Sequence, residues 1–174
     1  ESVISCAVNQ KFNLIACGTG DGILVLCTAS TSSILKIINL DPKSTTKIIA
    51  EKILISPTWG FIVAYCSEIS KGTVKYFISV YSLNGLFISK TKLQSSISNW
   101  YSWTSSKGFD YLAWSTENGI IYSAEIFYLK QSKFIYNCRS KVISINYSNK
   151  SSTLLIVTKN CEAVFIPYEI TIDV

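Results

Sequence analysis

One short strand–turn–strand pattern recurs along the chain, and it limits the fold more than any other feature of the sequence. In the clearest case, Leu14–Cys17 and Ile23–Thr28 are apolar runs joined by the turn residues Gly18-Thr19-Gly20-Asp21-Gly22. The same signal appears around Asn118-Gly119 and, in weaker form, around Asn160-Cys161. Short apolar runs bounded by Gly, Asn and Asp predict β-strands joined by tight turns.

The spacing of these signals predicts the architecture. Taking Gly22, Gly72, Gly119 and Cys161 as equivalent points, the intervals are 50, 47 and 42 residues. A repeat of roughly 40–50 residues with about four strands is typical of propeller blades. We therefore predict an all-β fold, a WD-type β-propeller fragment of about four blades, in one domain covering residues 1–174 with units at about 2–40, 46–93, 97–138 and 142–174.

Each unit is expected to contribute three or four strands. We expect them, in order, at 3–8, 14–17, 23–28 and 34–40; 52–56, 61–66, 74–82 and 86–93; 97–104, 111–115, 120–127 and 134–138; 142–147, 154–158, 163–167 and 170–174. Asp21-Gly22 is expected to form a type I′ turn, and Ser67–Thr73 a projecting loop. Because the chain has no Met and begins at Glu1, we interpret it as a fragment with further blades upstream.

Composition favours a packed β-protein. Hydrophobic residues make up 48% and charged residues 16% of the chain, which suits strands covered on both faces. No apolar run reaches the roughly 18 residues of a membrane-spanning helix. Most of the six cysteines lie in apolar runs and none forms a C-x-x-C pair, so we expect reduced thiols in a cytoplasmic protein and no metal site.

Several kinds of chemistry are excluded by the residue types present. The chain has no histidine, so a Ser-His-Asp triad and His-ligated metals are impossible within it. The glycine-rich residues 18–22 precede a strand rather than a helix, which argues against a phosphate loop. We expect no enzyme, no cofactor and no small-molecule substrate.

Charge and aromatic residues suggest two candidate binding surfaces. Between Glu125 and Glu162 the sequence has no carboxylate, and this interval holds a candidate basic face for anionic lipid or an acidic partner: Lys130, Lys133, Arg139, Lys141, Lys150 and Lys159. The alternative is a set of solvated turns and edge strands. Trp59, Trp100 and Trp103 are candidate partner contacts, with packing between blades as the alternative. Nucleic acid is not expected, because no basic residue lies among the aromatics between Lys92 and Lys107.

Three stretches resemble the C-terminal WD propeller of BEACH-domain proteins, the Beige and neurobeachin family. These are Ile53–Val63, which includes Ser56-Pro57-Thr58-Trp59-Gly60-Phe61; the hairpin Tyr81–Ile88; and Ile97–Tyr111, with its Trp100 and Gly108-Phe109-Asp110-Tyr111. The resemblance implies a non-catalytic scaffold that docks other proteins in vesicle and endolysosomal trafficking, peripheral to intracellular membranes. The absence of histidine means that the hydrogen-bonded His-Asp-Ser-Trp network of strict WD repeats cannot form here.

Two other interpretations remain open at this point. The same repeat would suit a structural coat or pore component. Six cysteines and the glycosylation patterns at Asn146 and Asn149 would suit a secreted β-domain stapled by disulfides.

Overall fold

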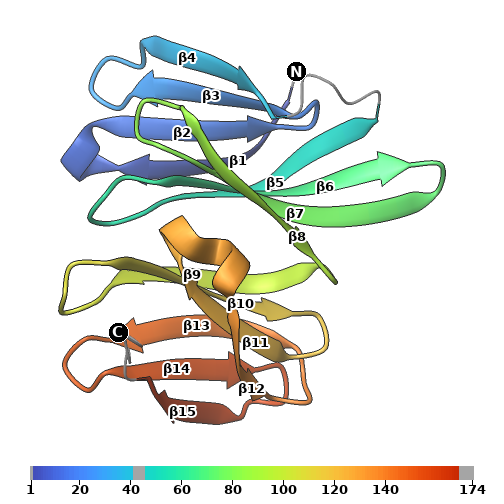
Figure 1. Cartoon of the computed structure of the whole chain (residues 1–174), viewed down its shortest axis with the longest axis vertical. Coiled ribbons are helices and arrows are strands. Elements are labelled where there is room, and N and C mark those ends of the chain that lie inside the picture. Colours follow the sequence, from blue (N-terminus) through green and yellow to red (C-terminus); the bar gives the residue numbers. More distant parts are fainter. Residues whose placement is uncertain (1, 41–45, 169–174) are drawn as a thin grey trace. The chain divides into compact units, whose positions relative to one another are not determined.

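The computed structural model describes residues 2–40 and 46–168, and it divides the chain into two compact units, Glu1–Gln94 and Ser95–Val174. Each unit consists of two antiparallel sheets in which strands that follow one another in sequence are hydrogen-bonded neighbours (Figure 1). This up-and-down order is the arrangement that short turns between successive strands produce.

The first unit contains two four-stranded sheets, β1-β2-β3-β4 and β5-β6-β7-β8. Their bounds are β1 Val3–Asn9, β2 Leu14–Thr19, β3 Ile23–Thr28, β4 Ile34–Asn39, β5 Lys47–Ile55, β6 Ile62–Ser70, β7 Thr73–Tyr81 and β8 Phe87–Leu93. A short 3-10 helix, η1 (Gln10–Phe12), joins β1 to β2.

The second unit contains a four-stranded sheet, β12-β11-β10-β9, and a sheet with three described strands, β13-β14-β15. Their bounds are β9 Ile97–Thr104, β10 Asp110–Thr116, β11 Ile120–Glu125, β12 Lys133–Asn137, β13 Val142–Ser148, β14 Thr153–Thr158 and β15 Ala163–Pro167. A second 3-10 segment, η2 (Ile126–Gln131), precedes β12. The predicted strand at 170–174 lies outside the described residues.

The core of the first unit is formed by side chains at every second position of its strands. Leu14 and Ala16 on β2 and Leu24 and Leu26 on β3 are buried against the facing sheet, whose members include Ile62. Each such buried aliphatic side chain contributes about 1.5–3 kcal/mol. This burial explains why the apolar residues of these strands recur at every second position.

The two sheets of the first unit approach each other closely at Gly18. A Cβ atom at this position would lie 2.6 Å from the Cβ of Ala50, so a larger residue would force the sheets apart. Next to this contact, the Ser5 hydroxyl donates a hydrogen bond of 2.8 Å to the Ala50 carbonyl. A glycine in a strand marks such a close approach.

The second unit has an aromatic core. Trp103 on β9 stacks on Tyr147 of β13 with a centroid distance of 4.7 Å, and Tyr111 and Tyr168 each have ring centroids 5.6 Å from it. Aliphatic residues of both sheets, including Ile156, complete the cluster. Aromatic packing therefore joins the two sheets of this unit.

Five turns share one local hydrogen-bonding pattern. In each, a Ser or Thr carbonyl accepts the N–H of the residue three positions on, which has positive φ, and the same residue's hydroxyl accepts the N–H four positions on. The Ser or Thr residues and their positive-φ partners are Thr19 with Gly22, Ser82 with Gly85, Ser105 with Gly108, Thr116 with Gly119, and Thr158 with Cys161. Local side-chain to backbone bonds thus define the turns.

Three local predictions are wrong. In the turn after Thr19 only Gly22 has positive φ, so Asp21-Gly22 is part of a three-residue loop and not a type I′ turn. The stretch Ser67–Thr73 is no projecting loop, because β6 and β7 continue through it to a two-residue turn, Lys71-Gly72, in which both residues have positive φ. β5 begins at Lys47, five residues before the expected start, with a register irregularity between Ala50 and Lys52 that the apolar pattern did not indicate.

Candidate partner-binding surface

One edge of the first unit gathers the loops that follow β1, β5 and β7. We call this the Trp59 edge and define it by η1, residues 56–61 and residues 82–86. The packing around Gly60 shows that these loops meet: a Cβ atom there would lie 2.8 Å from Leu83 Cδ1 and 3.0 Å from Phe12 Cε2. Gly60 has φ +70°, so the sequence Trp59-Gly60 permits a turn that brings three separate segments together.

Side-chain hydrogen bonds hold these loops in place. Asn9 Nδ2 donates to the Ser56 carbonyl at 3.1 Å, and Lys11 Nζ donates to the Thr58 carbonyl at the same distance. Lys36 Nζ donates to the carbonyls of Asn84 and Gly85 at 3.2 and 3.1 Å. The loops are therefore fixed by contacts between the two sheets.

The Trp59 edge exposes large apolar side chains. Trp59 is 58% exposed, Leu86 59% and Leu83 37%. The edge carries Lys11, and its residues include no carboxylate. Tryptophan is among the residue types enriched at the centre of protein-binding surfaces, and the exposed leucines add apolar area around it.

The other two candidate tryptophans occupy different environments. Trp103 is 3% exposed and lies in the aromatic core of the second unit, so its prediction as a partner contact is wrong: the side chain is used to pack β9 against β13. Trp100 is half-buried in β9 and pairs in register with Trp114. Trp59 is thus the candidate with a substantially exposed ring.

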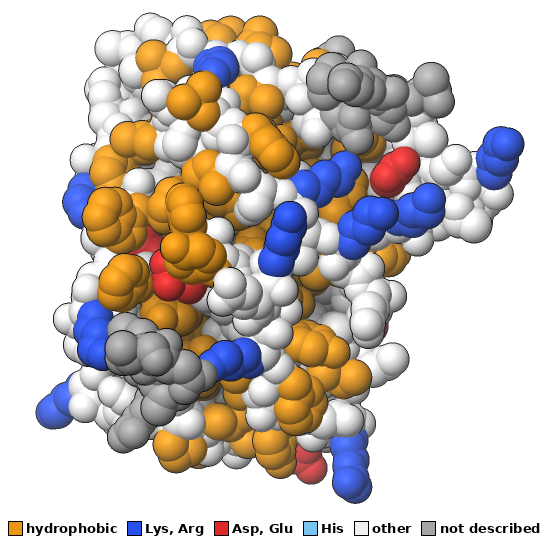
Figure 2. Space-filling model, in the orientation of Figure 1, with side chains coloured by type: hydrophobic (Ala, Val, Ile, Leu, Met, Phe, Trp, Pro, Cys, Tyr) orange, Lys and Arg blue, Asp and Glu red, His pale blue; other side chains and the backbone are white. Residues whose placement is uncertain are grey.

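The predicted single basic face is also wrong, because the sheet topology distributes its members to opposite ends of the strands. Lys130, Lys133 and Lys150 lie at the end where β12 begins and β13 finishes. Arg139, Lys141 and Lys159 lie at the end where β12 finishes and β13 begins. A six-residue strand separates such ends by about 20 Å. Over the surface formed by β9–β15, Figure 2 shows the basic side chains lying apart from one another.

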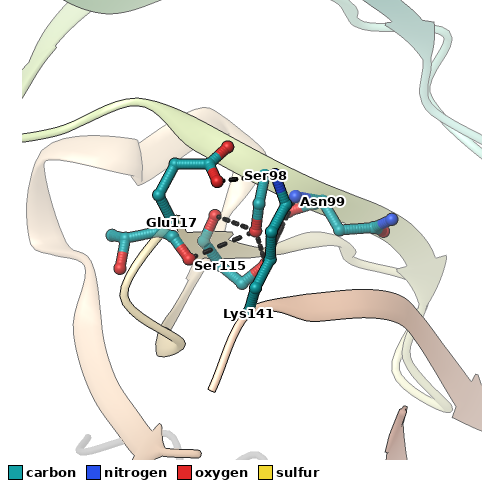
Figure 3. A network of polar contacts seen from close by, with 6 residues as sticks. Ser98, Asn99, Ser115, Glu117 and Lys141 are labelled. Carbon is teal, nitrogen blue, oxygen red and sulfur yellow. Dashed lines mark hydrogen bonds and ion pairs between the residues drawn. The ribbon is translucent and has the colours of Figure 1, made fainter. Parts of the chain in front are cut away.

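A polar network occupies one of these ends and partly neutralises its charge (Figure 3). Lys141 Nζ lies 2.6 Å from Glu117 Oε2, and both side chains are nearly half exposed. Below this pair the Ser98 and Ser115 hydroxyls share a hydrogen bond of 2.8 Å, and Asn99 Nδ2 donates to the Ile143 carbonyl at 2.9 Å. The network joins β9 and β10 to the start of β13, so its role is to hold these strands together.

The second unit has an open pocket of about 240 Å³ lined by polar residues and two tyrosines, among them Lys107, Tyr147 and Tyr168. This volume is below the roughly 300–1,000 Å³ of typical ligand pockets. Residues 2–40 and 46–168 contain no group of three or more Cys, Asp or Glu side chains placed to hold a metal ion.

Among the groups with shifted pKa values, the Cys66 and Tyr111 side chains are buried and that of Glu125 is partly buried. Burial raises the pKa of the Cys66 thiol to about 12 and, with Glu125 as a smaller cause, that of Tyr111 to about 12. Burial also raises the pKa of the Glu125 carboxyl, which faces Tyr111 across β10 and β11. All six cysteines are free thiols, so the structure gives the disulfide-stapled alternative no support.

Helices are scarce in the described part of the chain. The two 3-10 segments are its only helices, and neither has the length or the apolar run that a membrane span requires.

Comparison with known proteins identifies the fold of this chain but does not assign it to a family. No protein-family model matches the chain, and no curated protein sequence matches it. Among solved structures, the computationally designed Ika4 protein is similar, with a TM-score of 0.62, 14% sequence identity and coverage of 95% of this chain and 90% of Ika4. The computationally designed Ika8 protein has the same TM-score and identity and covers 95% of this chain, which spans 46% of the Ika8 chain.

These matches establish a β-propeller-like repeat fold whose four antiparallel sheets correspond to four blades. At 14% identity they carry no information about function. The resemblance to BEACH-domain proteins receives no support from them.

The sequence missed part of the Trp59 edge. Trp59 was predicted as a candidate partner contact, but Phe12, Leu83 and Leu86 come from loops tens of residues away. The available signal was a Ser-Leu-Asn-Gly-Leu turn at 82–86 with two leucines at positions where turns usually carry polar residues.

Proposed function

We propose that this chain is a non-catalytic protein-interaction scaffold that uses the Trp59 edge to hold a partner protein. The observation that carries the proposal is the 58% exposure of Trp59 on a loop frame fixed by Lys11 and Lys36. Tryptophan anchors of this kind dominate binding free energies when a partner buries them. The lysines and the absence of carboxylates favour a partner segment that combines apolar and acidic residues.

We further propose that the scaffold is the WD-propeller part of a BEACH-type protein, cytoplasmic and peripheral to intracellular membranes, in vesicle or endolysosomal trafficking. The support is sequence resemblance: Trp59 and Gly60 lie in the first of the three similar stretches, and the turn at 82–86 in the second. Residues 56–61 and 82–86 of these stretches lie in the Trp59 edge, so residues that carry the resemblance also contribute to the candidate surface.

Proximity labelling in cells, with the chain fused to a labelling enzyme, tests both parts. Trp59→Ala and Leu86→Ala should each deplete the same set of labelled proteins, and that set should consist of endolysosomal or vesicle-trafficking proteins. Val74→Ala is the matched control, because Val74 is an exposed apolar residue of the same sheet at the opposite end of β7.

Each part has its own contrary outcome. A labelled set that Trp59→Ala leaves unchanged, with the variant folded by circular dichroism, would refute the Trp59 edge as the binding surface. A set that depends on Trp59 but consists of coat or nuclear-pore proteins would refute the trafficking assignment and favour the structural alternative.

A further inference from the structure

Two cysteine side chains of the first sheet are in contact across neighbouring strands. Cys6 on β1 and Cys17 on β2 lie directly opposite each other in the register of this antiparallel pair. The Cys17 thiol donates a hydrogen bond to Cys6 Sγ, with 3.4 Å between the two sulfur atoms. The contact is made within one hairpin, so it depends only on the pairing of β1 with β2.

The backbone spacing at this pair suits a disulfide. Residues directly opposite each other in an antiparallel sheet have Cα atoms about 4.5–5.5 Å apart, and disulfides join Cα atoms about 4.4–6.8 Å apart. An S–S bond needs the sulfur atoms at about 2.0 Å, so the two thiols must approach by about 1.4 Å from their contact distance. Side-chain rotation can supply this movement while the strand pairing is kept.

A third cysteine of the same sheet is placed less favourably. Cys27 on β3 is opposite Ile15, which lies two residues before Cys17 on β2. Diagonal neighbours of this kind have Cα atoms about 7–8 Å apart, beyond the usual range of a disulfide. Cys6 and Cys27 are almost equally far from Cys17 in sequence, on either side of it. The folded sheet therefore selects Cys6 as the partner of Cys17, and sequence separation does not.

We propose that Cys6 and Cys17 are a thiol pair that hydrogen peroxide converts to a reversible cross-strand disulfide. The Cys6 thiolate attacks one peroxide oxygen, the O–O bond breaks, and Cys6 becomes a sulfenic acid while the released hydroxide takes up the thiol proton as water. Cys17 Sγ then attacks the sulfenic sulfur; the S–S bond forms, and the hydroxyl group leaves with the Cys17 proton as a second water. Two thiols are oxidised and one peroxide is reduced, and a dithiol reverses the change by exchange.

The contact also assigns the order of the two steps. Partial burial, followed by the hydrogen bond to Cys6, raises the pKa of Cys17 to about 11. Because the thiolate is the attacking form, a thiol with a raised pKa is a poor first nucleophile. Cys6 therefore reacts with the peroxide, and Cys17 resolves the sulfenic acid.

The bond would fasten a strand that is held on one side only. Among the described strands of its sheet, β1 is hydrogen-bonded to β2 alone (Figure 1). A covalent link in the middle of this pair opposes local opening of β1. The proposal is independent of the Trp59 edge, because neither cysteine belongs to it.

Peptide mapping of the unmodified chain after treatment with hydrogen peroxide is the direct test. Cleavage after Lys11 and before Asp21 places Cys6, Cys17 and Cys27 in three different peptides. The expected product joins the Cys6 and Cys17 peptides, leaves Cys27 free for alkylation and disappears with dithiothreitol. In urea the selection by the sheet is lost, so Cys17 should pair with either cysteine in comparable amounts. The same mixture from the folded chain, or no linked peptide, would overturn the proposal.

Serine variants test the selectivity and the order of steps. Cys27→Ser is the matched control, because it removes a cysteine of the same sheet outside the contact, and it should leave the linked peptide unchanged. Cys17→Ser should stop the reaction at a Cys6 sulfenic acid that dimedone traps, whereas Cys6→Ser should give little trapping at Cys17. Equal trapping in these two variants would overturn the order of steps.

Hydrogen exchange measures what the bond does to the fold. In the unmodified chain, the backbone amides of β1 should exchange more slowly after oxidation than before, and dithiothreitol should restore the original rate. The amides of β13–β15, which lie outside the first unit, are the internal control and should exchange equally in both states. Exchange in β1 that oxidation leaves unchanged would overturn the role of the bond in fastening this strand.

Discussion

A Cβ atom on Gly119 would lie 2.2 Å from the backbone carbonyl oxygen of Ser140. Gly119 is the positive-φ residue of the β10–β11 turn, and its own carbonyl accepts a hydrogen bond of 3.0 Å from the Cys138 N–H. The turn of one hairpin is therefore pressed against the segment that leads from β12 to β13. Only glycine meets both requirements, the left-handed backbone and the absent side chain.

We expect Gly119→Ala to lower the free energy of unfolding by about 3 kcal/mol, from left-handed strain of about 1–2 kcal/mol and overpacking of about 1–3 kcal/mol. Urea denaturation followed by tryptophan fluorescence measures the change. Gly72→Ala is the control, because Gly72 also has positive φ but no atom within 4 Å of a Cβ, so only the strain should appear. Equal losses in the two variants would contradict the role given to Ser140.

Cys161 occupies the turn position that glycine holds in the four other turns of this type, with φ +61°. Cys161→Gly should raise the free energy of unfolding by about 0.5–1 kcal/mol, because relief of left-handed strain exceeds the added backbone entropy of glycine in the unfolded chain. Cys161→Ser keeps the strain and should match the unmodified chain. A glycine variant no more stable than the serine variant would contradict the prediction.

Thr19 tests the turn hydroxyls. Its Oγ1 accepts the N–H groups of Asp21 at 3.3 Å and Ile23 at 3.1 Å, and the residue is 3% exposed. Thr19→Val keeps the shape and leaves both donors without this acceptor, so we expect a loss of about 1–3 kcal/mol in urea denaturation. Thr19→Ser restores the hydroxyl and should recover most of the loss. If serine and valine cost the same, the hydroxyl does not stabilise the turn.

Repeat spacing and strand patterns were sufficient to predict the class of fold and most strands, because the alternation of apolar residues such as Leu14, Ala16, Leu24 and Leu26 can be read from the local sequence. The predicted equivalence of Gly22, Gly72, Gly119 and Cys161 is confirmed, because each lies in the turn between the second and third strands of its sheet. The turn at Gly72 has only two residues, at the tip of a longer hairpin, and it lacks the Ser or Thr hydroxyl of the turns after Thr19, Thr116 and Thr158.

The binding surfaces were less predictable for a physical reason. Whether Trp59 or Trp103 is exposed depends on which strands face each other, and the strand sequences around them are similarly apolar. The basic residues between Glu125 and Glu162 are close in sequence, but each antiparallel strand carries the chain from one end of its sheet to the other. Lys133 and Arg139 therefore lie at opposite ends of β12 although they are close in sequence.

Trp103 should tolerate one substitution and not another. Trp103→Ala removes a 3%-exposed ring and should cost about 3–5 kcal/mol. Trp103→Phe should cost less than about 1.5 kcal/mol, because the indole N–H has no acceptor among the described residues and its removal offsets part of the lost packing. Urea denaturation followed by circular dichroism compares the two. A phenylalanine variant as unstable as the alanine variant would show that the indole N–H is satisfied.

Alkaline pH should weaken the fold through Cys66. Burial raises the pKa of this thiol to about 12, while in the unfolded chain it ionises with the ordinary pKa of about 8.5. Between these values the unfolded chain binds fewer protons than the folded chain, so the stability contributed by the neutral thiol is complete below about pH 8.5 and is lost as pH rises toward 12. Urea midpoints measured at pH 7.5, 8.5, 9.5 and 10 (roughly one-unit steps across that onset) should therefore fall with a steeper slope in the unmodified chain than in Cys66→Ala. Cys161→Ala, which removes an exposed thiol, is the matched control and should keep the unmodified slope. Identical slopes in all three chains would show that Cys66 does not remain neutral in the folded state.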